Sequence, residues 1–209
     1  MKGIIRLTRC MPVFALLILL KADAAGQNTK AGSGFVKWTI LNTGKMSVQG
    51  RTNINSFSCE IGGYSGKDTL KIYDSEKSKE PFRVAGSLRY RVDEFRSGSA
   101  MMTGHIKKTL ESEKYPFINI QAISFENRPD MTLNNQNIIA IIEIQLHGVS
   151  RRFPVNCQLR KEGPKVLSIR CEKSIKFSDF EINPPSTLGG LVRSQDQLTV
   201  LVSFAIRQI

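Results

Sequence analysis

The stretch "IIAIIEIQLHGVSRRFPVNCQL" (residues 138–159) has an apolar–polar alternation on each side of His147 and Gly148. Alternation with a period of two is the pattern of a β-strand that buries one face. Gly148 can adopt the positive φ that a tight turn needs. The stretch therefore predicts a β-hairpin with its turn at His147 and Gly148.

The same alternation runs through most of the 209 residues. Short turns separate the alternating stretches, which is typical of antiparallel sandwiches and barrels. We therefore predict an all-β fold, either an antiparallel sandwich or an antiparallel, eight-stranded barrel. The expected strands span residues 35–41, 45–54, 56–61, 68–74, 83–95, 117–126, 137–147, 152–160, 166–177 and 197–208.

Two stretches depart from the strand pattern. Met102, Ile106 and Leu110 recur at four-residue steps, which indicates one short helix within residues 99–116 that ends before Pro116. We expect this helix to cover one end of the barrel. Residues 177–191 contain a Pro-Pro and a Gly-Gly pair, so they predict a loop near the barrel mouth.

The first residues have the order of a secretory signal. Basic residues precede an apolar run at 10–20, and Ala22-Asp23-Ala24 follows it. The run is shorter than the roughly 20 residues that a membrane-spanning helix needs. We expect a signal peptide at 1–24, a flexible lead at 25–34 and one barrel domain at 35–209, and we expect the protein to be periplasmic or secreted.

The expected mature chain is basic. Residues 1–24 hold four of the 30 Lys and Arg and one of the 18 Asp and Glu, so their removal leaves a net charge of +9. The positive charges are scattered and export separates the protein from most nucleic acid, so no nucleic-acid partner is expected. An anionic membrane surface is the expected partner of this charge, with Lys107 and Lys108 at the barrel rim as candidate contacts. A soluble face without a partner is the alternative, and the chain is expected to be a monomer or a homodimer.

Three cysteines remain after the signal peptide: Cys59, Cys157 and Cys171. An oxidising compartment favours one disulfide. Cys157 and Cys171 are equally far from Pro164 and would lie opposite each other in a simple hairpin, but Cys59 could pair with either. With two histidines and no Cys-x-x-Cys motif, no metal site and no cofactor are expected.

His147 and Ser150 are the only candidates for a catalytic pair that the hairpin offers. A serine nucleophile needs a base within hydrogen-bond reach and a third group that orients the base. The G-x-S-x-G motif does not occur in this chain. A structural turn is therefore the preferred interpretation and no catalytic residues are predicted; a carboxylate such as Glu143 or Asp93 beside His147 would favour a hydrolase instead.

The barrel interior is the more informative feature. A closed barrel of about eight strands is either filled by its side chains or holds one slender ligand. The sequence does not decide between the two. A filled barrel would suit a structural or stress protein of the envelope that acts through its surface.

Four segments form a pattern in their order and spacing: "WTI" (38–40), "HIKKTLESEKYPFINI" (105–120), "IQLHGVSRRFPV" (144–155) and "SIKFSDFEI" (174–182). This pattern resembles that of the YceI-like proteins, a family of bacterial periplasmic proteins. The chain departs from the family pattern at Glu181, where a Gly is usual, and at Lys176 or Phe177, where an Arg is common.

The resemblance implies an extended lipocalin-like barrel that binds a polyisoprenoid lipid and has no catalytic residues. The implied function is binding and storage or transport of a long apolar amphiphile, such as a polyisoprenoid or an isoprenoid quinone. The family's tunnel is lined by inward apolar side chains. Strand parity gives the candidate ligand-binding residues of this chain as Trp38, Leu88, Tyr90, Met102, Ile142, Ile144, Phe153, Val155, Val200, Val202 and Phe204.

Overall fold

The computed structural model of the chain describes residues 34–41, 44–62, 68–74 and 80–209. The expected signal peptide and residues 25–33 of the expected lead lie outside these ranges. The strands are β1 (Phe35–Ile40), β2 (Lys45–Thr52), β3 (Ser56–Ile61), β4 (Thr69–Tyr73), β5 (Phe82–Arg91), β6 (Phe95–Ser97), β7 (Phe117–Phe125), β8 (Asn135–Leu146), β9 (Val149–Gly163), β10 (Val166–Lys176), β11 (Ser186–Thr187) and β12 (Val192–Gln208). The helices are α1 (Ala100–Thr109) and the short 3₁₀ segments η1 (Val92–Glu94), η2 (Ser178–Phe180) and η3 (Leu188–Gly190).

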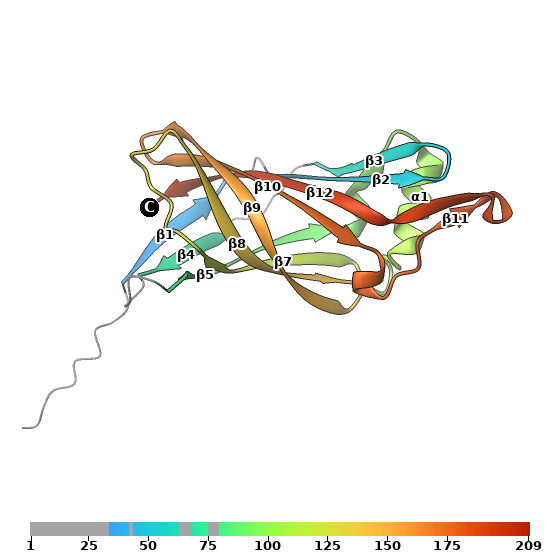
Figure 1. Ribbon diagram of the computed structural model, residues 1–209, viewed down its shortest axis with the longest axis horizontal. Helices are drawn as coiled ribbons and strands as arrows, with labels where there is room; N and C mark the ends of the chain where they lie inside the picture. The colour runs from blue at the N-terminus through green and yellow to red at the C-terminus, as the bar shows by residue number, and fades with distance from the viewer. Residues whose placement is uncertain (1–33, 42–43, 63–67, 75–79) are drawn as a thin grey trace, which may run out of the picture. The chain divides into compact units, whose positions relative to one another are not determined.

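Eight strands form a closed antiparallel barrel (Figure 1). The hydrogen-bonded order is β1-β4-β5-β7-β8-β9-β10-β12, and β12 pairs with β1 to close the ring. The predicted all-β, eight-stranded barrel with one short helix is therefore confirmed. No helix among the described residues has the length and apolarity that a membrane span requires.

A second group of strands extends the barrel wall. β12 pairs with β1 near its C-terminal end, at Ile206–Gln208, and with β2 over Ser194–Ser203. β3 and β6 continue the sheet beyond β2. Figure 1 shows β1 and β4 at one end of the barrel and β2, β3 and α1 at the other. The 17-residue β12 therefore belongs to the wall of both halves.

The hairpin at residues 138–159 forms as expected. Leu146 pairs with Val149, and His147 and Gly148 have φ of 53° and 79°. Positive φ at both central residues is the geometry of the two-residue type I′ turn, whose twist matches that of the flanking strands. A side chain on Gly148 would also press on the Tyr115 ring, 3.0 Å from the position of an added Cβ.

Ser99 caps the N-terminus of α1. The Ser99 side chain accepts a hydrogen bond from the Met102 backbone N–H at 3.1 Å, which satisfies one of the free amides of the first turn. α1 ends at Thr109, before Pro116, as predicted.

Two predicted segments differ from the structure in detail. The strand expected at 83–95 stops at Arg91, because the chain leaves β7 through η1 and pairs with β3 as β6. The loop expected at 177–191 contains η2, β11 and η3, and β11 pairs with the start of β12. Pairing with β3, which is distant in sequence, produces the first difference. The second arises from the local pairing of β11 with β12 and from the contact of Phe180 with Phe153 on β9.

The barrel wall between β9 and β10 is completed by η2. The two strands are paired only as far as Glu172 and Asn156. Beyond that point the Phe180 side chain of η2, 0 % exposed, lies with its ring centre 6.1 Å from that of Phe153 on β9. A 3₁₀ turn therefore fills the space where two barrel strands separate.

One disulfide crosses the β9–β10 ladder. Cys157 and Cys171 face each other with their Cα atoms 4.2 Å apart, and their sulfurs are bonded. Cys59 is a free, buried thiol. Of the pairings that the sequence left open, the hairpin pairing is therefore the one that forms.

Removal of this disulfide is expected to destabilise the barrel. A cross-link that closes a loop of about 15 residues lowers the free energy of the folded state relative to the unfolded state by about 3 kcal/mol in the chain-entropy treatment. The double variant Cys157→Ala, Cys171→Ala should lose about that much free energy of unfolding in urea titrations. Dithiothreitol should destabilise the wild type similarly and leave the double variant unchanged; a wild type insensitive to reductant would contradict the prediction.

Candidate functional site

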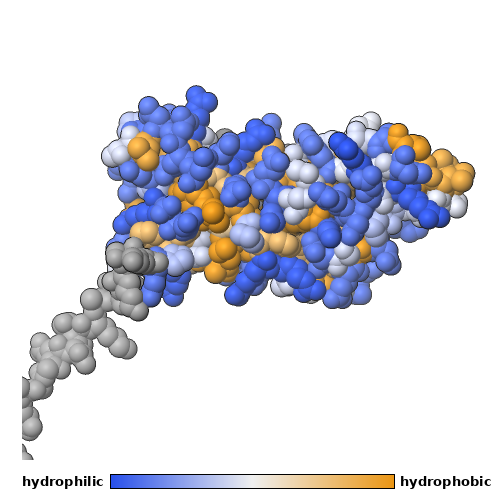
Figure 2. Space-filling model, viewed as in Figure 1, coloured by the Kyte–Doolittle hydropathy of each residue, from blue (hydrophilic) through white to orange (hydrophobic). Residues whose placement is uncertain are grey.

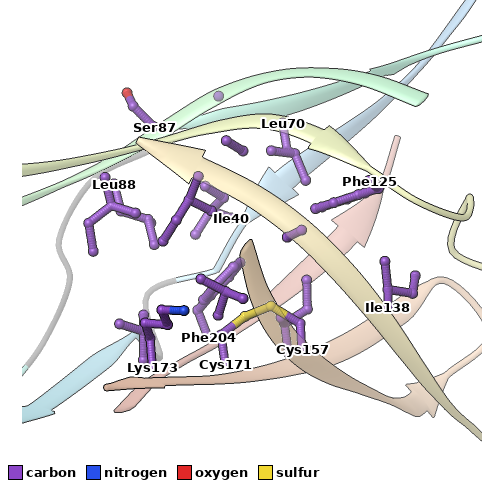
Figure 3. Close-up of a pocket in the computed structure, with 18 of the residues that line it drawn as sticks. Ile40, Leu70, Ser87, Leu88, Phe125, Ile138, Cys157, Cys171, Lys173 and Phe204 are labelled. Atoms are coloured by element: carbon purple, nitrogen blue, oxygen red, sulfur yellow. A yellow bond between two sulfur atoms is a disulfide. The ribbon is translucent and has the colours of Figure 1, made fainter. Parts of the chain in front are cut away.

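The barrel interior contains two apolar cavities, which we name chamber 1 and chamber 2. The centre of a water-sized sphere can move through about 80 Å³ of chamber 1 and about 90 Å³ of chamber 2. A single water needs only about 10–15 Å³ on this measure, so the side chains do not fill the interior. Figure 3 shows chamber 1 with the side chains that line it.

The chambers differ in the strands that form them. Chamber 1 lies beside β1 and β4, and chamber 2 beside β2, β3, β6 and α1. Chamber 1 is lined by Ile40, Leu70, Gly86, Ser87, Leu88, Ile120, Ala122, Phe125, Ile138, Ala140, Ile142, Ile144, Val155, Cys157, Leu159, Ile169, Cys171, Lys173, Val200, Val202 and Phe204. Chamber 2 is lined by Met46, Val48, Phe57, Cys59, Phe95, Met102, His105, Ile106, Thr109, Leu110, Ile118, Ile120, Ile144, Leu146, Ile175, Lys176, Phe177, Phe180, Ile182, Pro185, Ser194, Leu198 and Val200.

Three side chains belong to both chambers: Ile120 of β7, Ile144 of β8 and Val200 of β12. The two cavities therefore meet end to end inside the barrel. An elongated apolar molecule that passed these three side chains would occupy both.

Strand alternation aims the lining residues inward. Along β12, Leu198, Val202 and Ile206 are buried, whereas Val200 and Phe204 lie on the same inner face but are only partly buried. Such partial exposure on an inner face arises because these side chains border empty space instead of packed atoms.

Small residues also keep the interior open. Ala122 of β7 and Ala140 of β8 take inner positions that a larger apolar residue would fill. Gly86 lets β5 approach β4 closely, because an added Cβ would lie 2.7 Å from the Leu70 side chain and 2.9 Å from the Thr69 carbonyl oxygen.

The eleven candidate ligand-binding residues divide into two groups. Trp38, Tyr90 and Phe153 border neither chamber; Trp38 and Tyr90 are buried, and Phe153 packs on Phe180. That any of the eleven contacts a ligand stays a prediction. The residues that border a chamber are Leu88, Met102, Ile142, Ile144, Val155, Val200, Val202 and Phe204.

Sequence reasoning missed several lining residues, of which Lys173 is the most unusual. It follows Ile169 and Cys171 on the inner parity of β10 and precedes Ile175. The alternation in "SIRCEKSIKF" (168–177) was sufficient to place this lysine inside. A lysine is usually expected on the solvent side of a strand, and here that expectation conflicts with the alternation.

The polar residues that border the chambers are few, and the charged ones are Lys173 at chamber 1 and the exposed Lys176 at chamber 2. Burial raises the pKa of the Cys59 thiol to about 12, with a smaller contribution from the nearby Glu60 carboxylate. Burial likewise raises the pKa of Tyr90 to about 12. The Trp38 indole N–H is buried without an acceptor among the described residues. Cys59 and Tyr90 therefore stay protonated at neutral pH, and the Cys59 thiol is a poor nucleophile.

His147 makes contacts that differ from those of a catalytic base beside Ser150. Its Nε2 lies 3.2 Å from a carboxylate oxygen of Glu111, and its ring lies on Tyr115 with centroids 4.7 Å apart. Glu111 and Tyr115 follow α1, so the cluster ties the helix to the β8–β9 turn. Ser150 is exposed on the outer parity of β9.

The two carboxylates that would have favoured a hydrolase lie elsewhere. Glu143 pairs with Arg152 at 2.8 Å, and Asp93 pairs with Arg91 at 3.1 Å. The carboxylate beside His147 is instead that of Glu111, which the sequence gave no reason to expect, and among the described residues no hydrogen bond joins His147 to Ser150.

Solved structures share this fold. A polyisoprenoid-binding domain from Saccharophagus degradans, described as implicated in plant cell wall breakdown, superposes with a TM-score of 0.58 at 10% identity, over 82% of this chain and 98% of that domain. BcnA from Burkholderia cenocepacia superposes with a TM-score of 0.56 at 13% identity, over 78% of this chain and 95% of BcnA. A variant of the YceI protein of Campylobacter jejuni matches with a TM-score of 0.50 at 12% identity, over 70% of this chain and 82% of that protein.

The sequence comparisons give no match. No protein-family model matches the chain, and no curated protein matches it significantly. At 10–13% identity the structural matches establish that the chain has the fold of YceI proteins.

Proposed function

We propose that the chain binds a long apolar amphiphile inside its barrel and stores or carries it in the bacterial envelope. A polyisoprenoid or an isoprenoid-quinone-like lipid is the ligand class that we favour. The observation that carries the proposal is the pair of apolar chambers that meet at Ile120, Ile144 and Val200. The polyisoprenoid-binding domain with the same fold supports the choice of ligand class.

The energetics support such a function without a specific polar contact. Burial of apolar surface is worth about 25 cal/mol per Å². A ligand that buries several hundred Å² reaches micromolar affinity even after the cost of association is subtracted. We therefore expect the protein to accept several related lipids.

Two other functions are less well supported. A structural or stress protein with a filled barrel does not need the empty chambers that the interior has. A hydrolase that uses His147 and Ser150 would need the two side chains to meet. Glu111 lies where the carboxylate of a triad would, but among the described residues no hydrogen bond joins His147 to Ser150, and Ser150 is exposed on the outer face. We accordingly propose that the protein is not an enzyme.

The proposed place of action is the periplasm or the outside of the cell. The Cys157–Cys171 disulfide is typical of proteins outside the cytoplasm. Basic residues of the last turn of α1, Lys107 and Lys108, are proposed contacts with an anionic membrane surface.

Mass spectrometry of lipid extracted from the purified protein tests the proposed function. We expect one apolar species, or a narrow series that differs in chain length, in a near-stoichiometric amount. The variant Val200→Phe, whose new ring would occupy the junction of the chambers, serves as the control and should carry much less lipid. Equal amounts of lipid in both proteins, or none in the wild type after reloading with excess prenyl lipid, would contradict the proposal.

A further inference from the structure

Lys173 is a charged side chain on the otherwise apolar wall of chamber 1. Its strand neighbours of the same parity, Ile169, Cys171 and Ile175, are buried or partly buried apolar residues. Figure 3 shows the amine nitrogen of Lys173 on the cavity side of the strand, near Cys171 and Phe204. The position is one that a methionine or isoleucine would fill in a purely apolar tunnel.

The Lys173 ammonium has no ionic partner within the described residues. The contact that it does make is with the Phe153 ring, whose centre lies 5.6 Å from Nζ. No described carboxylate lies within 4.0 Å of Nζ, and Glu172 next to it is on the outer face. Lys173 is only partly buried and also borders an open polar groove on the outer side of β10, so its ammonium lies between this groove and chamber 1 without an opposite charge from the described residues. The chain itself does not supply that charge to this position.

The position suits the head of an amphiphile. Lys173 follows directly on Glu172, the last β10 residue that pairs with β9, so it lies where the two strands separate. Across the other edge of β10 its partner is Val200, which borders both chambers. A head group at Lys173 would therefore sit at the side of the barrel, with its apolar tail free to extend into the chambers.

We infer that Lys173 is a head-group site, and that the ligand is an acidic amphiphile with a carboxylate or phosphate head. This inference rests on the proposed function and narrows its ligand class, long apolar amphiphiles, to those with an anionic head group. Carboxylate and phosphate oxygens form charge-assisted hydrogen bonds with an ammonium, which an alcohol or a quinone carbonyl matches less well.

Three probes that share one prenyl tail test the inference: farnesoic acid, farnesyl phosphate and farnesol. Calorimetry on the full protein should give the wild type about a tenfold preference for at least one acidic probe over farnesol. Lys173→Met should lose this preference and keep its affinity for farnesol. Arg170→Met, which removes a cation from the outer face of the same strand, should behave as the wild type.

The outcomes separate this inference from the proposed function. Equal affinities of the wild type for all three probes would overturn the head-group site and leave apolar binding intact. Failure to bind any probe would argue against the proposed function itself. The stronger of the two acidic probes identifies the head as a carboxylate or a phosphate.

A separate observation concerns one end of the molecule, where three large apolar side chains are exposed. Ile54 is 67% exposed, Leu188 74% and Leu191 76%. We call these three residues the apolar tip. Ile54 lies on the β2–β3 turn, Leu188 in η3 and Leu191 directly after η3. Figure 2 shows a hydrophobic patch at the end of the barrel where Figure 1 places β11.

Specific contacts hold the apolar tip together. The Asn53 side chain donates to the Leu191 carbonyl oxygen and accepts from the Arg193 backbone N–H, both at 2.9 Å. Leu188 has a φ of 53°, a conformation that is strained for a residue with a side chain of this size. Two loops distant in sequence are thus fixed side by side with their apolar side chains in solvent.

The charged residues within the two loops that carry the apolar tip are both basic. Residues 50–56 and 185–195 include Arg51 and Arg193 but no Asp or Glu. The Arg193 Nε donates to the Gly190 carbonyl oxygen at 2.8 Å, which holds its cation directly behind the loop. An anionic bilayer has an apolar layer of acyl chains beneath a layer of negatively charged head groups. Exposed apolar side chains with cations next to them match these two layers.

We propose that the apolar tip inserts into an anionic lipid bilayer. Chamber 2 is bordered by Pro185 and Ser194, which flank η3 in sequence. The inserted end would therefore be the end next to chamber 2. This proposal does not depend on the identity of the ligand.

Vesicle sedimentation tests this proposal. The wild type should bind phosphatidylcholine vesicles that contain phosphatidylglycerol, and the variant Ile54→Ser, Leu188→Ser, Leu191→Ser should bind them at least about tenfold more weakly, since each side chain loses its apolar burial. Leu133→Ser with Ile139→Ser, which removes exposed apolar residues elsewhere, is the matched control and should bind as the wild type. Charge reversal of Lys107 and Lys108 measures the helix contribution separately.

Two results would overturn the tip proposal. One is unchanged vesicle binding by the tip variant. The other is a concentration-dependent dimer of the wild type that the tip variant does not form, which would make a second copy of the chain the occupant of the tip.

Discussion

Replacement of Val200 by Phe is expected to lower the affinity for a long prenyl lipid by about a hundredfold. Val200 borders both chambers, so the added ring would stand where a ligand passes from one to the other. We expect the new ring to keep about four carbons of the ligand chain out of the interior. At about 0.8 kcal/mol for each buried CH₂, this removes about 3 kcal/mol of binding free energy. Each 1.4 kcal/mol is about a tenfold change in affinity, which gives the expected factor.

Fluorescence titration with a prenyl-chain probe measures the effect of Val200→Phe. The barrel should still fold, because the inner side of Val200 faces empty space rather than packed atoms, and overpacking costs only about 1–3 kcal/mol. Thr199→Phe places the same ring on the outer face of β12 and should leave the affinity unchanged. Wild-type affinity in the Val200→Phe protein would mean that the ligand does not use the junction of the chambers.

Phe180→Ala is expected to be the most destabilising of the single substitutions considered, by about 3–5 kcal/mol, the usual cost of removing a buried phenyl ring. Phe180 is 0% exposed and fills the wall where β9 and β10 are no longer paired. Its removal leaves a cavity that the strands cannot close, because η2 and not a hydrogen-bonded strand covers that part of the barrel.

Urea unfolding of Phe180→Ala gives this free energy directly. Phe35→Ala is the matched control, since Phe35 is 49% exposed and borders neither chamber. It should cost well under half as much. If the two variants were equally stable, η2 would be a peripheral loop rather than part of the barrel wall.

The local features of the fold were the most predictable from the sequence. The hairpin at His147 and Gly148 follows from residues that are neighbours in the chain, and α1 follows from its spacing and from Pro116. The end of β5 before Val92 and the start of a new strand, β6, after η1 were not predictable. They depend on the pairing of β6 with β3. η2 was missed for the same reason, because Phe180 is fixed by Phe153 on another strand.

The interior could be predicted in part. Parity identified inner residues such as Ile144 and Val200, but it does not give the registers that bring them together from β8 and β12. Whether an inner side chain borders a cavity or packs solidly, as Trp38 does, depends on the volumes of residues across the barrel. Glu181 shows a further limit: it has a φ of 58° at the position where the YceI-like pattern has Gly, so a turn can persist after the residue best suited to it is gone.

The closure of the ring by β1 and β12 has a consequence for biogenesis. The N-terminal strand of the barrel obtains its second neighbour only from the final strand, at Trp38–Gln208 and Ile40–Ile206. Contacts of such long sequence separation form slowly. The barrel therefore cannot close until β12 is available to pair with β1, and until then the unpaired edges of the sheet are exposed to aggregation.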